Sequence, residues 1–158
     1  MKEICRAYKF RIYPDAEQQL NLEKTFGCSR YIYNWALAQR KEAYAEGIKL
    51  KNNDVSQRLT LLKKQTETEW LNEVSSVCLQ QSLMNLDTAY QNFFKHGAKH
   101  PKFKKKSDKQ AVRYVKSAFT FSGGKLKLAK HKKSLTMKLS RTFLGEVTSV
   151  TVSKNPDG

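Results

Sequence analysis

The spacing of apolar residues changes twice along the chain. Tyr8, Phe10 and Ile12 alternate with cationic residues in the segment 5–13, and this period of two predicts a strand with one apolar and one cationic face. Beyond Pro14 the period lengthens to three or four residues, and it returns to two near the C-terminus. The pattern therefore predicts a strand, then a block of helices, then several more strands.

Two helices are predicted in the first part of the helical block. Asp15 and Gln18 form a capping-box pattern at the start of the first helix, and Gly27 suits the position just after its end. The second helix is expected from about 29 to 46, closed by Gly47. Its apolar face consists of Tyr31, Trp35 and Ala38, with Ile32 and Ala36 beside them.

Two more helices are predicted before residue 95. The third follows a polar turn at residues 52–54, where Asp54 and Gln57 again suit a capping box. The fourth spans about 76–94 and carries the longest apolar stripe of the chain, which is expected to be buried. The stripe consists of Leu79, Leu83, Leu86, Tyr90 and Phe93.

Strand patterns follow a cationic linker. Residues 96–110 have no periodicity, and about four strands are predicted after them, with Gly123 and Gly124 in a hairpin turn. The alternating apolar residues are Phe119, Phe121, Leu126, Leu128, Leu135, Met137, Leu139, Val150 and Val152. An isolated strand is not stable, so the segment 5–13 needs partners, and the candidates lie beyond the helices.

The predicted fold class is therefore α+β. It is a small β-barrel or curved antiparallel sheet, interrupted after its first strand by a four-helix insertion. The expected domains are residues 1–14 plus 112–158 for the barrel, 15–100 for the helical insertion and 101–111 for a basic linker.

Charge is concentrated in the C-terminal part. The 158 residues include 30 Lys and Arg against 14 Asp and Glu, a net charge of +16. Residues 1–94 carry 13 basic and 11 acidic side chains, a net charge of +2, whereas residues 95–158 carry 17 and 3, a net charge of +14. Such a concentration of positive charge attracts a polyanion.

The sequence gives no positive sign of catalysis. Carboxylates fall mainly on predicted helical faces, and the histidines lie among lysines, which would repel a metal ion. Cys28 and Cys78 are expected to be buried structural residues. No catalytic residue, metal ligand or cofactor is therefore assigned. No apolar run approaches the roughly 20 residues that a membrane span needs, and the cytoplasm, in association with the nucleoid, is the expected location.

Binding chemistry is better supported. The segment 102–106 (KFKKK) places Lys102, Lys104, Lys105 and Lys106 around Phe103. Lysines neutralise phosphates, and an aromatic ring stacks on a base or anchors the segment to the core. Arg113 and Lys116 continue the pattern into the first C-terminal strand. The alternative is a flexible, solubilising lysine run.

Six ordered motifs resemble the N-terminal part of the TnpB family, the OrfB-type proteins of insertion sequences, known as RNA-guided DNA endonucleases and related to type V CRISPR effectors. The motifs cover essentially the whole chain. They are YKFRIYP at 8–14, FGCSRYIYNWALA at 26–38, LDTAYQNFFK at 86–95, PKFKKK at 101–106, LKL at 126–128 and VTSVTVS at 147–153.

The resemblance implies a wedge β-barrel interrupted by a helical recognition insertion. In the family these parts hold a guide RNA and recognise a short motif beside the target in double-stranded DNA. Ser56, Gln80 and Ser117 match positions that approach this motif, and Trp70 lies between the first two. The backbone-binding cations would be Lys102, Lys104, Lys105, Lys106, Arg113 and Lys116.

The family's RuvC-like nuclease, which uses Mg²⁺, and its zinc ribbon lie C-terminal to everything matched here. Catalytic residues are therefore not carried over to this chain, which has the appearance of one part of such a protein. Two other functions stay open: a nuclease-dead RNA-guided DNA-binding repressor, and a single-stranded nucleic-acid binder that uses no guide.

Overall fold

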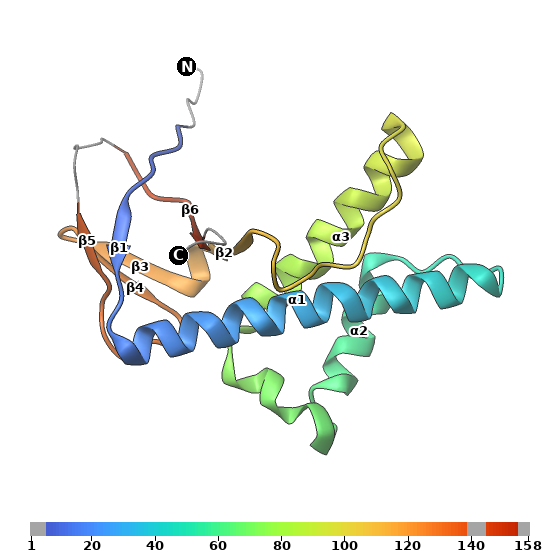
Figure 1. Ribbon diagram of the computed structural model, residues 1–158, viewed down its shortest axis with the longest axis horizontal. Helices are drawn as coiled ribbons and strands as arrows, with labels where there is room; N and C mark the ends of the chain where they lie inside the picture. The colour runs from blue at the N-terminus through green and yellow to red at the C-terminus, as the bar shows by residue number, and fades with distance from the viewer. Residues whose placement is uncertain (1–5, 139–144, 155–158) are drawn as a thin grey trace.

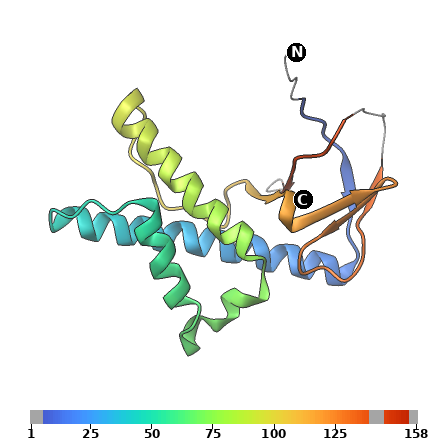
Figure 2. The same ribbon diagram turned by 180° about the vertical axis from the view of Figure 1, so that it is seen from behind.

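The computed structural model describes residues 6–138 and 145–154. Its elements are β1 (Arg11–Tyr13), α1 (Ala16–Ala45), α2 (Asn52–Leu62), the 3-10 helix η1 (Thr66–Glu73), α3 (Ser76–His96), β2 (Gln110–Val115), the short 3-10 helix η2 (Lys116–Ala118), β3 (Phe119–Ser122), β4 (Lys125–Leu128), β5 (Thr136–Lys138) and β6 (Ser149–Lys154). The α+β class is as predicted. In both Figure 1 and Figure 2 the strands lie at one end of the molecule and α2 and α3 at the other, with α1 running through both regions.

The prediction that α1 breaks at Gly27 is wrong. The two predicted helices form one continuous helix of 30 residues. A C′ glycine adopts a left-handed backbone, which Gly27 does not. Phe26 and Cys28, on either side of it, are each buried in a different hydrophobic core. Their burial outweighs the cost of a glycine inside a helix, which is about 1 kcal/mol.

The capping box at the start of α1 is confirmed. The Gln18 backbone N–H donates to Asp15 Oδ1 at 2.8 Å, and the Asp15 N–H donates to Gln18 Oε1 at 2.9 Å. Gln18 is also buried, and its amide nitrogen donates to the Ser134 carbonyl at 3.1 Å. The cap therefore ties the start of α1 to the strands as well as beginning the helix.

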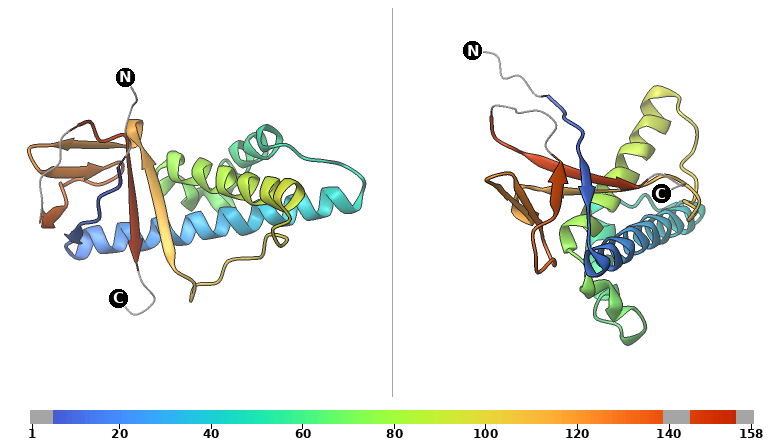
Figure 3. Two further views of the ribbon diagram at one scale, coloured as in Figure 1. Left: turned by 90° about the horizontal axis from the view of Figure 1, so that it is seen from above. Right: turned by 60° about the vertical axis from the view of Figure 1, so that its left-hand side comes forward.

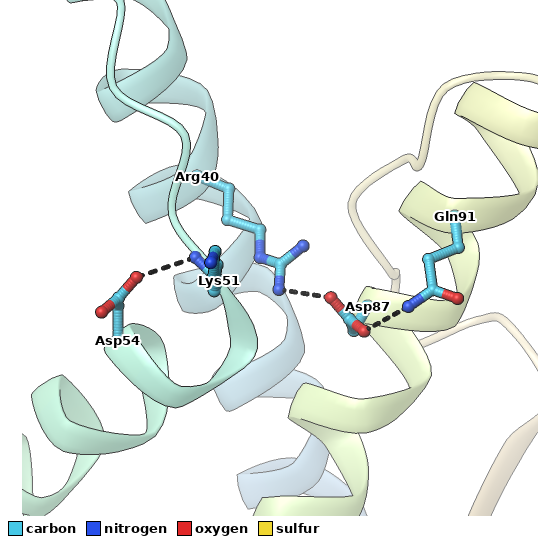
Figure 4. A network of polar contacts seen from close by, with 5 residues as sticks. All are labelled: Arg40, Lys51, Asp54, Asp87 and Gln91. Carbon is cyan, nitrogen blue, oxygen red and sulfur yellow. Dashed lines mark hydrogen bonds and ion pairs between the residues drawn. The ribbon is translucent and has the colours of Figure 1, made fainter.

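Helix α2 begins earlier than predicted. Its first residue is Asn52, and Asp54 lies in the first turn instead of preceding it. The Asp54 carboxylate accepts a hydrogen bond from the Lys51 backbone N–H at 2.9 Å (Figure 4). A carboxylate in this position stabilises the helix start from inside the first turn, because it satisfies a free N–H and faces the positive end of the dipole.

Two hydrophobic cores share α1. The helical core joins the C-terminal part of α1 to α2, η1 and α3; its buried members include Ile32, Ala36, Leu37, Val55, Leu59, Leu71, Leu79, Leu83, Leu86 and Tyr90. The strand core joins the strands to the N-terminal parts of α1 and α3; its members include Leu22, Phe26, Cys78, Val112, Tyr114, Phe119, Leu126, Leu128, Leu135 and Val152. The stripe predicted for the fourth helix is buried except for Phe93, which is half-buried.

The face predicted for the second helix is displaced. Ile32 and Ala36 are fully buried, whereas Tyr31 is 39% exposed and Trp35 is half-buried. Because a helix turns 100° per residue, neighbouring apolar positions on α1 face different surroundings. The core takes Ile32 and Ala36, and the large aromatic side chains lie at its margin.

The strands form three antiparallel pairs, β1–β5, β2–β6 and β3–β4. Ile12 lies opposite Met137, so the prediction that the N-terminal strand pairs with a C-terminal one is confirmed. The strand is shorter than predicted, since residues 6–10 lie outside it; residues 1–5 and Leu139 lie outside the described residues. Strands β2 and β6 run side by side (Figure 3). Within residues 6–138 and 145–154 the three pairs do not close into a barrel.

Candidate nucleic-acid interface

The linker of residues 101–109, here called the lysine strap, lies along α1 and contains no helix or strand. The Asn34 side chain of α1 holds its middle. The Lys104 backbone N–H donates to Asn34 Oδ1 at 2.7 Å, and Asn34 Nδ2 donates to the Lys104 carbonyl at 2.9 Å. Two such bonds reproduce the pairing of neighbouring strands, so the strap is fixed at this point. The strap is therefore not a freely flexible lysine run.

The lysines of the strap have different surroundings. Lys104 places its ammonium 4.4 Å from the centre of the Tyr33 ring, and partial burial lowers the pKa of Lys104, with Asp108 opposing the shift. All five lysines of the strap are exposed, and Lys104 differs from the others in its ring contact and in the desolvation of its ammonium group. Lys104 therefore fastens the strap through its ring contact. The other four lysines, Lys102, Lys105, Lys106 and Lys109, face solvent.

Phe103 also helps to anchor the strap to α1. Its ring is 48% exposed, and the ammonium of Lys41, on α1, lies 4.7 Å from the ring centre. A cation over an aromatic ring contributes about 0.5–1 kcal/mol at an exposed site. Of the two roles predicted for Phe103, this contact supports that of an anchor to the helix.

The remaining predicted phosphate contacts lie on and after β2. Arg113 is exposed and lies opposite Thr151 in the β2–β6 pair. Lys116 forms an ion pair with Glu146. A phosphate at Lys116 would compete with that carboxylate, whereas Arg113 points outward from the ladder.

Ser56 and Gln80 lie in contact, although 24 residues separate them. The Ser56 hydroxyl of α2 donates to Gln80 Oε1 of α3 at 3.1 Å. Both side chains are half-buried. Ser117 lies in η2 and is exposed; within the described chain, no hydrogen bond joins it to the Ser56–Gln80 pair.

An open groove of about 560 Å³ lies beside the strap. It is lined by Gly27, Arg30, Tyr31, Asn34, Trp35 and Trp70. The Tyr31 and Trp70 rings meet edge to face with their centres 5.0 Å apart. Sequence reasoning assigned these aromatic residues to apolar clusters and missed the groove. Three of its residues, Arg30, Asn34 and Gly27, break the apolar pattern on the same helix face, and that interruption was the available signal.

The two buried cysteines are structural, as predicted. Burial raises the pKa of Cys28 and of Cys78 to about 11, so both remain protonated thiols at neutral pH. Both are free and buried. A protonated, buried thiol is a weak nucleophile and a poor metal ligand.

None of the helices in the described ranges is both long enough and apolar enough to cross a membrane.

The N-terminal part matches a known family model. HTH_OrfB_IS605, described as a helix-turn-helix domain, matches residues 1–49. Over the described part of this match, residues 6–49, the chain forms β1 and the single helix α1. Two helices joined by a turn are therefore not found in that part.

Three relatives are similar over most of the chain. "Putative RNA-guided DNA endonuclease" of Streptomyces pristinaespiralis is 43% identical over 162 residues, covering 100% of this chain and 40% of the relative. "Putative RNA-guided DNA endonuclease InsQ" of Escherichia coli K12 is 33% identical over 156 residues, covering 98% and 39%. "Virulence protein VsdF" of Salmonella dublin is 38% identical over 116 residues, covering 67% of this chain and 98% of the relative.

The chain spans about two fifths of the length of the first two relatives and nearly all of the third. The family model and the names of the first two relatives agree with the resemblance drawn from the sequence. The resemblance to the OrfB-type, or TnpB, family of insertion-sequence proteins is confirmed: residues 1–49 match its helix-turn-helix model, and the chain is homologous to proteins named putative RNA-guided DNA endonucleases.

Proposed function

We propose that this chain binds a guide RNA and recognises the target-adjacent motif for a TnpB-like RNA-guided DNA endonuclease of a transposable element. The observation that carries the proposal is the lysine strap, which Asn34 fixes along α1 while Lys102, Lys105, Lys106 and Lys109 face solvent. A fixed row of ammonium groups contacts phosphates at defined positions. Its partners would be the guide RNA and double-stranded target DNA.

Recognition would be divided between RNA and protein. Base pairing with the guide reads the target, and protein side chains read only the adjacent motif. The Ser56 hydroxyl bond to Gln80 Oε1 supports this role for Gln80, because it limits rotation of the amide. An oriented Gln amide pairs with adenine through two hydrogen bonds in the major groove. Ser117 is proposed as a further contact to the motif.

The proposed domains follow the family's layout. Residues 1–14 and 112–158 would form the wedge, 15–100 the recognition insertion and 101–111 the basic linker. The β1–β5 pair supports joining the N-terminal segment to the C-terminal strands. The continuous helix α1 supports a rigid connection between the two parts.

We assign no hydrolytic step to these residues. A RuvC-like site holds Mg²⁺ with converging carboxylates. Among the described residues, His, Cys, Asp and Glu side chains do not gather in groups of three that could hold a metal ion. The side chains present therefore do not fit such a centre, and the function proposed for them is binding.

The strap is tested by salt-dependent binding to duplex DNA. For about six neutralised phosphates, the slope of log affinity against log salt is expected near −5. Replacing Lys102, Lys105 and Lys106 with Ala should make the slope shallower by about 3, because each phosphate contact contributes about 0.9. The matched control replaces Lys51, Lys63 and Lys64 with Ala. It removes the same charge outside the strap and should leave the slope unchanged; equal effects of both triple variants contradict the proposal.

Motif reading is tested with the chain purified together with its RNA and a pool of duplexes of random sequence. The parent should enrich one motif, and Gln80→Ala should weaken its preference by about 1–3 kcal/mol, the value of one good base contact. Gln81→Ala, on the next position of α3, is the control. If Gln80→Ala lowers affinity for every sequence equally, Gln80 does not read bases.

The identity of the RNA that copurifies also distinguishes the proposed function from the alternative, a single-stranded nucleic-acid binder that uses no guide. One dominant structured RNA is expected for a guided protein. A mixture of unrelated RNAs would favour the single-stranded nucleic-acid binder, for which the exposed lysines alone are sufficient.

A further inference from the structure

Gly27 has no conformational reason to be a glycine. It lies inside α1 with a helical backbone, and a Cβ atom built on it would meet nothing within 4 Å. Alanine would therefore fit and would favour the helix. Because Gly27 has no side chain, the space beside it is open. This space is part of the groove beside the strap, which Gly27 lines.

The walls of this groove come from two elements. Gly27, Arg30, Tyr31 and Asn34 follow one another at helical spacing on one face of α1, and Trp70 of η1 lies across from them. The Trp70 indole N–H donates to the Glu67 carbonyl at 2.9 Å, which holds the ring in place. Tyr31 and Trp70 are still 39% and 38% exposed. Two partly exposed rings thus line a groove to which Gly27 contributes no side chain.

The polar residues of the groove connect it to the strap. Asn34 is the residue that binds the Lys104 backbone, so the middle of the strap lies at the edge of the groove. Arg30 Nη1 donates to Gln110 Oε1 at 3.2 Å, which uses one of the five N–H donors of a guanidinium. If a planar aromatic group bound in the groove, the Arg30 guanidinium and the lysines of the strap would lie beside the chemical group to which it is attached. This arrangement suits a base attached to a phosphate backbone.

We propose that the groove binds one unpaired nucleobase of a single strand whose phosphates lie on the lysine strap. The proposal rests on the nucleic-acid binding proposed above and adds a preference that the strap alone does not give. The strap attracts any phosphate backbone. The groove accepts only a base whose face is free, because bases in a duplex are covered by their neighbours in the stack. The volume of about 560 Å³ lies within the usual range of ligand sites, roughly 300–1,000 Å³.

The chain offers a direct probe of this site. It has two tryptophans, Trp35 and Trp70, and both line the groove. Tryptophan fluorescence of the whole 158-residue chain should therefore be quenched by an oligoadenylate single strand. A DNA duplex of the same length should quench it much less, even where both ligands bind.

Two substitutions test the groove by different routes. Trp70→Ala removes a stacking surface, and Gly27→Leu fills the groove while keeping both rings and introducing a better helix former. Each should weaken oligoadenylate binding about tenfold and change duplex binding less than twofold. Leu61→Ala, at a site 63% exposed on α2 and outside the groove, should change neither. Far-ultraviolet circular dichroism checks that each variant is folded.

The outcomes separate this proposal from the one on which it rests. If the fluorescence is not quenched and both variants bind oligoadenylate as the parent does, the groove is not a base site. If the strap triple variant alone loses affinity, nucleic-acid binding stands without the groove. If Gly27→Leu weakens single-strand and duplex binding equally, the proposed preference is wrong.

Discussion

The helical and strand regions of this molecule differ in how they are held together. The helical core is formed by long helices whose apolar faces meet, and an ion pair between Arg40 and Asp87 at 2.8 Å joins α1 to α3 (Figure 4). The strand region consists of three short two-stranded pairs. Two-stranded pairs of this kind are marginal on their own.

The strand region therefore depends on α1. Leu22 and Phe26 of this helix belong to the strand core, and Gln18 binds the chain before β5. Glu23 forms an ion pair with Lys154 of β6 at 2.6 Å. Helix α1 therefore serves as the main support of the strands and as one wall of the helical core. Most of the positive charge lies on the part that needs this support.

The largest expected effect comes from removing a side chain of α1 on which the strand region depends. Phe26→Ala should lower the free energy of unfolding by about 3–5 kcal/mol, because it removes a buried aromatic ring and leaves a cavity. Hydrogen exchange should accelerate first in β2, β3 and β4, with α2 and α3 still protected. Leu20→Ala, at a site 59% exposed on the same helix, is the control. Uniform loss of protection across both regions would show that they unfold as a single unit.

A smaller effect is expected from the pair that joins the helices. The side chains of Arg40 and Asp87 are 10% and 29% exposed. Asp87→Ala should cost about 1.5–3 kcal/mol, because the pair makes a charged hydrogen bond and the Arg40 guanidinium would stay partly buried. The exposed pair of Lys24 and Glu73 is the comparison, and Glu73→Ala should cost under about 1 kcal/mol. Denaturant unfolding of both variants measures the difference; equal costs would contradict it.

The smallest effect concerns His131, in the strand region. Its side chain is buried, and neither ring nitrogen has a hydrogen-bond partner within the described structure. Burial lowers the pKa of His131, with Asp15 and Glu17 opposing the shift. The folded protein therefore binds this proton less readily than the unfolded chain. Its contribution to stability is full above the ordinary pKa of about 6.5 and falls as the pH drops below it.

Thermal unfolding between about pH 5 and 8 measures this effect. His131→Gln should reduce the loss of stability at the acidic end. His96→Gln, at an exposed position of α3, should not. An unchanged pH profile in His131→Gln would mean that other groups cause the loss.

Much of the fold follows from local sequence. The cap of Asp15 and Gln18, the buried stripe of α3 and the need of the first strand for a distant partner were all predictable. Each depends on a residue's neighbours in sequence or on a rule about unpaired strands. The candidate site was predictable in part: the lysines were found, and the groove was not.

The misplaced boundaries have a common cause. Glycine is common just after the end of a helix, and aspartate just before its start. These local preferences therefore predicted helix ends at Gly27 and Asp54. In the structure Gly27 lies where α1 passes from one core to the other, and Asp54 caps α2 from its first turn. Local preferences of about 1 kcal/mol yield to the burial of several large side chains.

The sequence by itself determined the element types, the charge of the C-terminal part and the residues able to contact phosphate. Only the tertiary structure decided that Asn34 fixes a strap 70 residues away, that Ser56 meets Gln80, and that Gly27, Tyr31 and Trp70 line one groove. Periodicity assigns a residue to a face of its own element. Which residue of another element it meets depends on how the elements pack, and no local pattern contains that information.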